Sequence, residues 1–436
     1  MKKRMKRTAI ALILMPALLT GCSLDDDGIK ELEPEPEIEP AISLVDNMEL
    51  TPAELELVNN NNEFAFNLFR QITDPAVDSG MKSHIVSPLS ITYALGMLNN
   101  GAAGNTQAQI NEALGFGDTG ADSINAFCYK MIKTAPVLDS LTKVMISNTI
   151  YMNQGYYLNP DFVRKANYYY DAYPQTRDFH DPQTLTEINQ WASDHTEHMI
   201  EKVLDNDFNE NAVSYLLNAI YFKGSWTYKF DKSRTKVEDF IFPDETDGLL
   251  SCNMMQMHSD IDYAVTDQYQ AVRLPYGNGS FQMTVLLHKI QQTDPPLPIV
   301  ELDLRPTVPT LEQWQEINRN MSQREVMLKM PRFETESKID LIEIMKRLGM
   351  TDAFIAEDAD FSNFCDVPTY IGLMKQVAKI KLDEEGTEAA AVTVIGVDWT
   401  SEAPSYISFI ANRPFIYVIS EKKSGAIFFI GQYTGH

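Results

Sequence analysis

The order of hydrophobic and polar residues predicts both helices and strands in this chain. Between residues 379 and 383, charged side chains alternate with Ile and Leu, which is the period of a β-strand. Phe281–Leu287 and Val326–Phe333 have a similar strand-like composition. From residue 51 to 72, by contrast, apolar residues recur at helical spacing behind a Thr-Pro pair, and a hydroxyl followed by Pro favours a helix start.

The strand that ends at Asp383 continues into an unusual segment, DEEGTEAAAVTVIGVDWTS, which spans 383–401. Gly386 interrupts the strand because glycine adopts backbone angles that other residues avoid. If the following residues form an extended strand, their side chains alternate between two rows, one on each face. One row is uncharged and begins with small residues: Thr387, Ala389, Ala391, Thr393, Ile395, Val397 and Trp399. The other row carries both charges: Glu388, Ala390, Val392, Val394, Gly396, Asp398 and Thr400.

Three interpretations of this segment remain open at this point. A helix is favoured by its Glu and Ala residues, although the later β-branched residues and Gly396 oppose it. An ordinary exposed loop or an edge strand is a second interpretation. The third is a segment that can be buried on its uncharged side within a sheet, with a flexible joint at Gly386.

The first part of this segment and three further motifs support the third interpretation through a family resemblance. EEGTEAAAVT at Glu384–Thr393 resembles the proximal hinge of inhibitory serpins, whose reactive loop inserts into a β-sheet after cleavage. HIVSPLSI at 84–91 and NAIYFKGSW at 218–226 resemble two other motifs of that family, as does LIEIMKRLGMTDAF at 341–354. The C-terminal segment resembles its closing strands, so the resemblance covers 51–436.

This resemblance implies an α+β serpin fold with three β-sheets, about eight to nine helices and an exposed reactive-centre loop. It implies one domain over 51–436, with the reactive-centre loop at about 384–405. The implied hinge residues are Glu384, Glu385, Gly386, Thr387, Glu388, Ala389, Ala390 and Ala391. A new central strand must fit between two existing strands, and small side chains suit that requirement.

The resemblance also implies a shutter, the region under the sheet where it must open. Its implied residues are Ser87, Ser90, Asn218 and Gln376, with Trp226 at the top of the sheet where the loop enters. Helix capping by Ser87 and core packing by Trp226 are simpler roles that agree with this assignment. The family usually has His where this chain has Gln376. We expect Gln376 to bridge Ser87 and Asn218 by hydrogen bonds without titrating.

The implied function is suicide inhibition of serine endopeptidases, and of papain-like cysteine endopeptidases as a further possibility. The usual loop length of the family, counted forward from Gly386, predicts cleavage between Thr400 and Ser401. Counted back from the strand at Phe409, it gives 401–403. Trp399 is an alternative residue for contact with the target's specificity pocket. The stretch from Gly386 to Asn412 contains no Lys or Arg, which favours elastase-like or chymotrypsin-like targets over trypsin-like ones. The alternative is a non-inhibitory serpin that acts as a binding or carrier protein.

The N-terminal residues predict export and lipid attachment. Residues 1–21 combine five basic side chains with an apolar run, as in a secretory signal peptide. Leu19–Cys22 resembles a bacterial lipobox, in which Cys22 becomes the lipidated first residue; a plain signal peptide is the alternative. Residues 22–50 are acidic and contain Pro, which predicts an extended tether. We therefore expect a lipid anchor in the outer membrane of a Gram-negative bacterium, with the protein exposed at the surface or in the periplasm.

Charge and composition restrict the partners. The net charge is −25, and removal of residues 1–21 with their five basic side chains brings it to −30. Nucleic acid and a heparin-type cofactor are therefore not expected as partners. With Cys22 lipidated, three cysteines remain at spacings that imply neither disulfides nor a zinc site, and we expect no cofactor. His195 and His198 fit a solvated helix face better than a metal site. No sequence motif of an enzyme appears, and we expect a monomer whose partner is the target endopeptidase.

Overall fold

The computed structural model describes residues 48–205, 208–210, 212–242, 249–290, 304–387 and 406–435. Within them the chain forms eight α-helices: α1 (Pro52–Ile72), α2 (Pro88–Asn99), α3 (Gly104–Ala113), α4 (Ala121–Thr134), α5 (Pro160–Tyr170), α6 (Pro182–Asp194), α7 (Leu311–Asn320) and α8 (Ile342–Arg347). None of the described helices is long and apolar enough to span a membrane.

Side-chain caps and prolines set the starts of these helices. Thr51 accepts a hydrogen bond from the Glu54 backbone and Glu54 returns one to Thr51, which is the capping box of α1. Ser87 caps α2 by accepting from the Ser90 backbone. Pro occupies the first turn of α1, α2, α5 and α6, where its missing N–H has no helical partner to lose. The helix start expected at residues 51 and 52 is confirmed.

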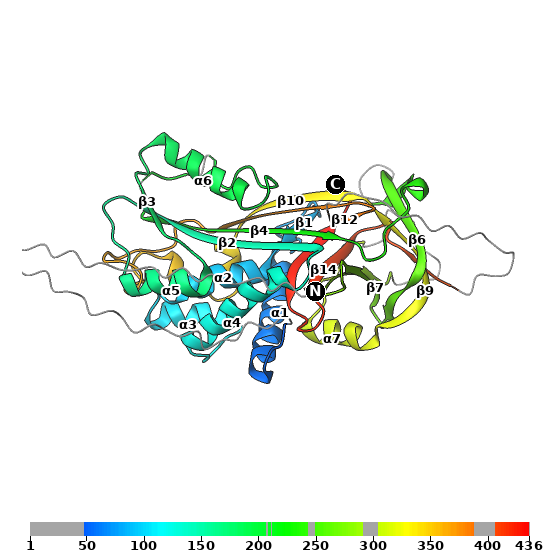
Figure 1. Cartoon of the computed structure of the whole chain (residues 1–436), viewed down its shortest axis with the longest axis horizontal. Helices are drawn as coiled ribbons and strands as arrows, with labels where there is room; N and C mark the ends of the chain where they lie inside the picture. The colour runs from blue at the N-terminus through cyan, green and yellow to red at the C-terminus, as the bar shows by residue number, and fades with distance from the viewer. Residues whose placement is uncertain are drawn as a thin grey trace, which may run out of the picture. The chain divides into compact units, whose positions relative to one another are not determined.

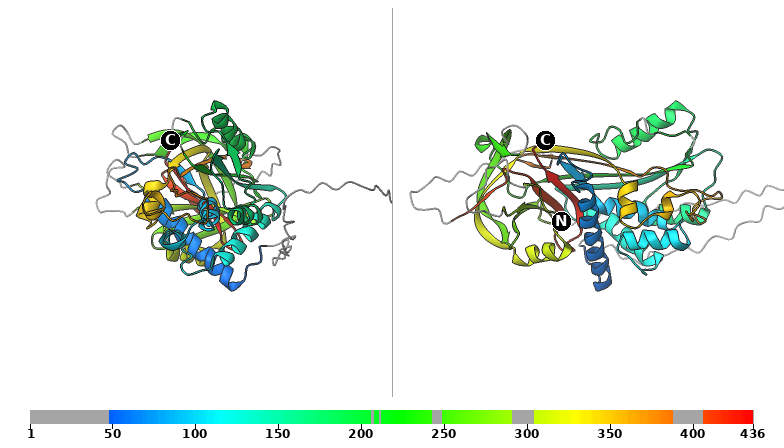
Figure 2. Two further views of the ribbon diagram at one scale, coloured as in Figure 1. Left: turned by 90° about the vertical axis from the view of Figure 1, so that its left-hand side faces the viewer. Right: turned by 180° about the vertical axis from the view of Figure 1, so that it is seen from behind.

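Six strands form one sheet in the order β10-β11-β12-β4-β2-β3. Figure 1 shows α6 on one side of this sheet and α2, α4 and α5 on the other, and the rear view in Figure 2 shows the same separation. The strands are β2 (Thr142–Asn153), β3 (Gln175–Arg177), β4 (Ser214–Ser225), β10 (Phe333–Asp340), β11 (Lys375–Leu382) and β12 (Gly386–Thr387).

The remaining strands are connected along the order β1-β15-β14-β8-β7-β6-β9-β13, with β5 paired to β6. The long β6 pairs with β5 over 249–254, with β9 over 254–263 and with β7 over its last four residues. The described strands thus form two connected sheets, where the resemblance implied three. The bounds are β1 (His84–Val86), β5 (Lys236–Ile241), β6 (Leu249–Val265), β7 (Tyr269–Tyr276), β8 (Phe281–His288), β9 (Ser322–Pro331), β13 (Ile407–Ile410), β14 (Phe415–Glu421) and β15 (Ile427–Tyr433).

One large hydrophobic cluster forms the main core, and two smaller clusters lie at α6, around Phe179 and around Val377. Every residue of α2 is buried, and so is every residue of β14 and β15. A helix that is apolar all round must be enclosed, which explains why α2 lies against the inner face of the six-stranded sheet. The sequence thus predicted the α+β class correctly, and the C-terminal strands close the core.

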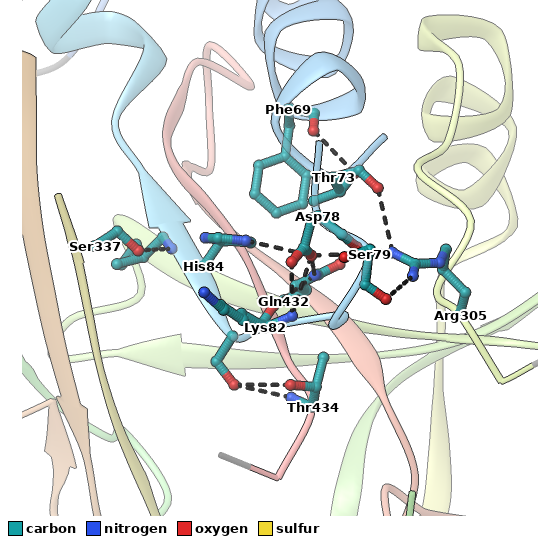
Figure 3. A network of polar contacts seen from close by, with 12 residues as sticks. Phe69, Thr73, Asp78, Ser79, Lys82, His84, Arg305, Ser337, Gln432 and Thr434 are labelled. Atoms are coloured by element: carbon teal, nitrogen blue, oxygen red, sulfur yellow. Dashed lines mark hydrogen bonds and ion pairs between the residues drawn. The ribbon is translucent and has the colours of Figure 1, made fainter. Parts of the chain in front are cut away.

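A buried polar network ties the connection between α1 and β1 to β15 (Figure 3). The Asp78 carboxylate accepts from the Lys82 backbone at 3.0 Å and from Gln432 Nε2 at 3.3 Å. His84 Nε2 lies 3.3 Å from the same carboxylate, and Arg305 Nη1 lies 3.9 Å away. Burial lowers the pKa of His84 although Asp78 opposes that shift, so folding favours the neutral imidazole.

Candidate functional site

The hinge begins with a tight turn that returns the chain from β11 to the sheet. The backbone N–H of Asp383 donates to the Gly386 carbonyl at 2.9 Å, and the Asp383 side chain accepts from the Glu385 N–H at 2.8 Å. The two-residue strand β12 follows directly. It pairs with Leu382 of β11 on one side and with Gly224 and Ser225 of β4 on the other. Gly386 and Thr387 therefore lie between two strands of the sheet, and the rest of the segment in the third interpretation of the sequence lies outside the described residues.

Gly386 is required by its backbone angle and by its surroundings. Its φ is +145°, in the region that L side chains rarely adopt. A Cβ at this position would collide with the carbonyl oxygen of Gly224 and with the backbone of Ser225. This close approach between two strands explains the glycine that interrupts the strand pattern in the sequence.

Thr387 directs its side chain into the core. It is buried, and its Oγ1 lies 2.8 Å from the hydroxyl of Tyr276. Burial raises the pKa of Tyr276 far above its usual range, so that hydroxyl keeps its proton and remains a hydrogen-bonding group. The inward direction of Thr387 sets the direction of every second residue after it in an extended segment.

Trp226 lies beside the turn, at the place where the sequence predicted that the loop enters. Its indole Nε1 donates to the Asp383 carbonyl at 3.0 Å, and its backbone N–H donates to the Glu385 carbonyl at 2.8 Å. The indole ring stacks on Tyr276 with 4.4 Å between centroids and 14° between planes. Trp226 is thus a core aromatic residue that also holds the hinge turn in place by two hydrogen bonds.

Glu385 is buried and held by two lysines. Lys229 Nζ lies 2.8 Å from one carboxylate oxygen and Lys232 Nζ lies 3.0 Å from the other. Desolvation acts to raise the pKa of Glu385, but hydrogen bonds from the two lysines outweigh it and the pKa is lowered. The carboxylate is therefore ionised in the folded protein at neutral pH.

Glu384 is buried on the other side of the turn. Thr235 Oγ1 donates to its carboxylate at 2.7 Å, and Arg332 Nη1 lies 3.7 Å from it. Its carbonyl oxygen accepts from the Phe230 N–H at 2.9 Å. Both hinge glutamates are therefore fixed by residues of neighbouring segments, which makes the turn a rigid base for the chain that follows.

The shutter residues come together beneath the sheet, with one difference from the expectation. Gln376 Oε1 accepts from the Ser87 N–H at 2.8 Å, while its Nε2 donates to the Ser87 carbonyl at 3.0 Å and to Ser90 Oγ at 3.3 Å. Asn218 Nδ2 instead donates to Asn148 Oδ1 at 2.8 Å. The bridge expected from Gln376 to Asn218 is wrong for this state, because both ends of the Gln376 amide are engaged by α2.

Several predicted site residues lie outside the described residues. They are Cys22, Glu388, Ala389, Ala390, Ala391, Trp399, Thr400 and Ser401. The reactive bond, the second half of the hinge and the lipidation site therefore stay predictions.

Sequence reasoning missed the partners that hold the hinge. Lys229, Lys232 and Thr235 follow Trp226 closely, and basic residues near a conspicuous pair of glutamates were the available signal. Arg332 and Asn148 gave no such signal, because they are far from the hinge and from Asn218 in the sequence. Only the register of the strands brings them close.

Comparisons with known proteins agree with this architecture. The chain matches the family model described as Serpin (serine protease inhibitor) over residues 59–435. It is 27% identical to neuroserpin of Gallus gallus over 381 residues, covering 85% of this chain and 89% of that protein. It is 29% identical to heparin cofactor 2 of Oryctolagus cuniculus, covering 85% of this chain and 76% of that protein.

Solved structures give the same result. The native state of tengpin, a thermophilic serpin, superposes with a TM-score of 0.76 at 27% identity, covering 89% of this chain and 96% of that one. Thyroxine-binding globulin in complex with thyroxine superposes with a TM-score of 0.74 at 25% identity, covering 86% and 98%.

Proposed function

Because the chain belongs to the serpin family, whose members mostly inhibit proteases, we propose that it is a suicide-substrate inhibitor of serine endopeptidases and of papain-like cysteine endopeptidases. The observation that carries this proposal is the position of Gly386 and Thr387. These two residues already occupy the space between β4 and β11, and the next two residues of the same row in the sequence, Ala389 and Ala391, are small.

The chemistry of the proposed reaction belongs to the target. Its catalytic oxygen or sulfur attacks the carbonyl carbon of Thr400 and forms an ester or thioester. The peptide bond to Ser401 breaks, and the new amino group of Ser401 takes a proton from the target's general acid. Hydrolysis of the acyl bond would complete an ordinary turnover, and inhibition requires that this second step fails.

Insertion of the cleaved loop into the sheet would prevent hydrolysis of the acyl bond. Once cut, the chain from Thr387 onward can extend β12 between its two neighbours and gain a backbone ladder on both sides. About fourteen residues at roughly 3.3 Å each carry the acylated target roughly 46 Å. A displacement of even about 1 Å in an active site is costly, so a target dragged and compressed in this way should lose its hydrolytic geometry.

The composition of the loop supports a preference among targets. No Lys or Arg occurs from Gly386 to Asn412, so a trypsin-like pocket finds no basic residue to bind. Elastase-like and chymotrypsin-like enzymes are the favoured targets. Cleavage after Thr400 agrees with the usual loop length, and cleavage at Trp399 or at 401–403 would leave the mechanism unchanged.

A non-inhibitory binding protein is the alternative, and thyroxine-binding globulin exemplifies it among the structural neighbours. The hinge favours inhibition, because bulky or charged inward-facing residues would obstruct a new central strand. Here Thr387 is buried, and the next residues at strand spacing in the sequence are Ala389 and Ala391.

The proposal is tested by mixing the chain from Ser23 onward with pancreatic elastase, chymotrypsin, trypsin and papain in separate reactions. A band that survives denaturing electrophoresis with elastase or chymotrypsin is expected, and the mass of the released C-terminal fragment locates the cut. Thr387→Arg is the matched control, because a charge at the buried hinge should permit cleavage but prevent trapping. Clean cleavage without any covalent band would favour the non-inhibitory alternative, and a covalent complex with trypsin would contradict the proposed specificity.

We further propose that the mature protein is a monomer anchored to the outer membrane through lipid on Cys22. The motif before Cys22 and the acidic segment after it support this anchor. The wild-type protein should enter the detergent phase after membrane extraction, whereas Cys22→Ala should remain in the aqueous phase. Protease accessibility on intact cells then distinguishes the cell surface from the periplasm.

A further inference from the structure

The turn between β7 and β8 contains one of the two Asn-Gly pairs of the sequence. Asn278 and Gly279 lie in this turn, and the other pair is Asn100 and Gly101 at the end of α2. An Asn side chain can react with the backbone nitrogen of the next residue, and glycine favours this because it has no Cβ to obstruct the approach. The reaction also needs a side chain that can move and access to water. The two pairs differ in both respects.

Asn100 is buried, and its side-chain amide is fully engaged. Its Nδ2 donates to the Gly96 carbonyl at 3.1 Å and to Asn125 Oδ1 at 2.8 Å, while its Oδ1 accepts from Asn125 Nδ2 at 2.8 Å. The backbone N–H of Gly101 donates to the Leu98 carbonyl at 2.8 Å. Because Asn100 is fixed and shielded from water, we expect this pair to stay intact.

Asn278, by contrast, is exposed and lies between two glycines. Gly277 and Gly279 have φ angles of +47° and +87°. A Cβ on Gly279 would meet nothing within 4 Å, so the space beside its backbone nitrogen is open. Water and the Asn278 side chain can therefore both reach the bond at which a reaction would occur.

A backbone hydrogen bond in the turn prepares the Asn278 amide for attack. The Ser280 N–H donates to Asn278 Oδ1 at 2.9 Å. This donor would stabilise the negative charge that develops on Oδ1 when a nucleophile adds to Cγ, as an oxyanion-hole donor does. The nucleophile would be the Gly279 nitrogen, whose N–H donates to the Tyr276 carbonyl at 2.6 Å. Attack requires that this second bond opens, which makes the conversion slow.

We propose that Asn278 is a site of spontaneous deamidation, with water as the co-reactant. The Gly279 nitrogen gives its proton to hydroxide and bonds to Asn278 Cγ, and the bond from Cγ to Nδ2 breaks as ammonia leaves with a proton from water. Water then opens the cyclic imide at either of its two carbonyl carbons, which gives aspartate or isoaspartate. The sum converts asparagine and water into aspartate and ammonia, without oxidation or reduction.

The Asn278 side chain holds this turn against the segment that leads into β2. Its Nδ2 donates to the Leu138 carbonyl at 2.9 Å, and its backbone N–H donates to Asp139 Oδ2 at 3.2 Å. A carboxylate in place of the amide cannot donate to Leu138, and it carries a charge of the same sign as Asp139. Deamidation therefore weakens the contact between the two segments.

The same turn supports the end of β4 that pairs with the hinge. The Gly277 N–H donates to the Ser225 carbonyl at 2.8 Å, and the Thr227 hydroxyl donates to the Gly277 carbonyl at 2.9 Å. Ser225 is the partner of Gly386 in β12. Deamidation of Asn278 thus acts as a slow chemical timer that loosens this end of β4. The inference does not depend on the proposed inhibition of endopeptidases.

Peptide mapping by mass spectrometry tests the conversion, with the folded chain from Ser23 onward stored at pH 8 and at pH 5. The peptide that contains Asn278 should gain about 1 Da and separate into two products, faster at pH 8 because the attacking nitrogen must lose its proton. The peptide that contains Asn100 is the internal control and should not change, and samples digested before storage correct for conversion during digestion. Asn278→Gln is the matched variant, because its longer side chain would have to close a larger ring. An unmodified Asn278 after storage, or equal conversion at Asn100, would overturn the proposal.

Asn278→Asp reproduces the aspartate product and tests its effect on the fold. Its equilibrium constant for urea unfolding should be roughly twofold to tenfold larger than that of wild type. Hydrogen exchange of the backbone amides at 224–227 should also be faster, because this end of β4 opens more often. Asn278→Gln keeps an amide donor and should lie closer to wild type. If Asn278→Asp equals wild type in both measurements, the effect on β4 is wrong.

Discussion

Gly386 lies so close to Gly224 that a Cβ on residue 386 would collide with the carbonyl oxygen of Gly224. The two residues belong to β12 and β4, which are adjacent strands although the residues are far apart in the sequence. Pairing of β12 with β4 at this position therefore requires glycine at residue 386. Gly386 and Thr387 therefore already lie between β4 and β11, where the proposed insertion would begin.

Replacement of Gly386 by Ala should therefore destabilise the uncleaved protein. The side chain adds a collision at Gly224 and strain at a φ of +145°, which together should cost about 1–3 kcal/mol. Urea unfolding measures the loss. Gly80→Ala is the control, because a Cβ there meets nothing within 4 Å, and its stability should change little. An unchanged midpoint for Gly386→Ala would show that β12 does not form.

The ion pairs of Glu385 should contribute stability that depends on pH. Truncation in Glu385→Ala should lower the unfolding free energy by about 1–2 kcal/mol at pH 7, since Lys229 and Lys232 lose a buried partner but are themselves partly exposed. The pKa of Glu385 is lowered in the folded state, so its contribution is complete above about 4.5 and is lost as pH falls through the lower folded value.

The measurement is urea unfolding of both proteins from pH 7 to pH 3, and the difference between them should shrink below pH 4.5. Glu343→Ala removes the exposed pair with Lys346 and should change stability by less than about 0.5 kcal/mol at every pH. A difference between wild type and Glu385→Ala that stays constant down to pH 3 would contradict the ion-pair interpretation.

The polar network around Asp78, which connects the segment before β1 to β15, should contribute to the free energy of unfolding. Asp78→Ala removes the carboxylate that accepts from the Lys82 N–H and from Gln432 Nε2, and the loss of these hydrogen bonds should cost about 1–3 kcal/mol. Gln432 keeps the Lys82 carbonyl as an acceptor, and Arg305 keeps the backbone carbonyls of residues 78 and 79. Lys82→Ala is a matched control, because the donor at this residue is the backbone N–H and its side chain is exposed. Equal unfolding midpoints for the two variants would mean that the network does not stabilise the fold.

The sequence predicted the class of fold and the location of the hinge because both depend on local patterns. Alternation around residue 380, the Thr-Pro helix start and the small residues after Gly386 are each readable within a short window. The partners of the hinge could not be predicted in this way. Arg332 meets Glu384 only because β9 and β10 lead the chain past the turn, and that arrangement is a property of the whole sheet.

The shutter shows a second limit of sequence reasoning. The family resemblance assigned Ser87, Ser90, Asn218 and Gln376 to one region, and the structure brings Gln376 against Ser87 and Ser90. Residue type could not decide which hydrogen bonds these side chains form. An amide offers two donors and two acceptor lone pairs, so several pairings satisfy it equally well. The packing of α2 against β11 selected Ser87 and Ser90 for Gln376.

Replacement of Gln376 by His should introduce a pH dependence that the shutter of this chain lacks. Gln376 is 4% exposed, and it forms hydrogen bonds with the neutral groups of Ser87 and Ser90. Burial without an anionic partner disfavours the imidazolium, so the folded pKa of the new His should lie below its ordinary value of about 6.5. Its neutral form is then compatible with the fold and its charged form is not. Stability relative to wild type should fall as pH decreases below about 6.5.

Urea unfolding of Gln376→His and wild type between pH 8 and pH 5 measures this effect as a difference between two proteins. The comparison cancels the contribution of His84, whose pKa is lowered by burial in both. Gln376→Asn serves as the control for loss of the hydrogen bonds, because it shortens the amide without adding a titrating group. A pH-independent difference for Gln376→His would mean that the new imidazole is accessible to water, and therefore that the shutter opens readily before any cleavage of the loop.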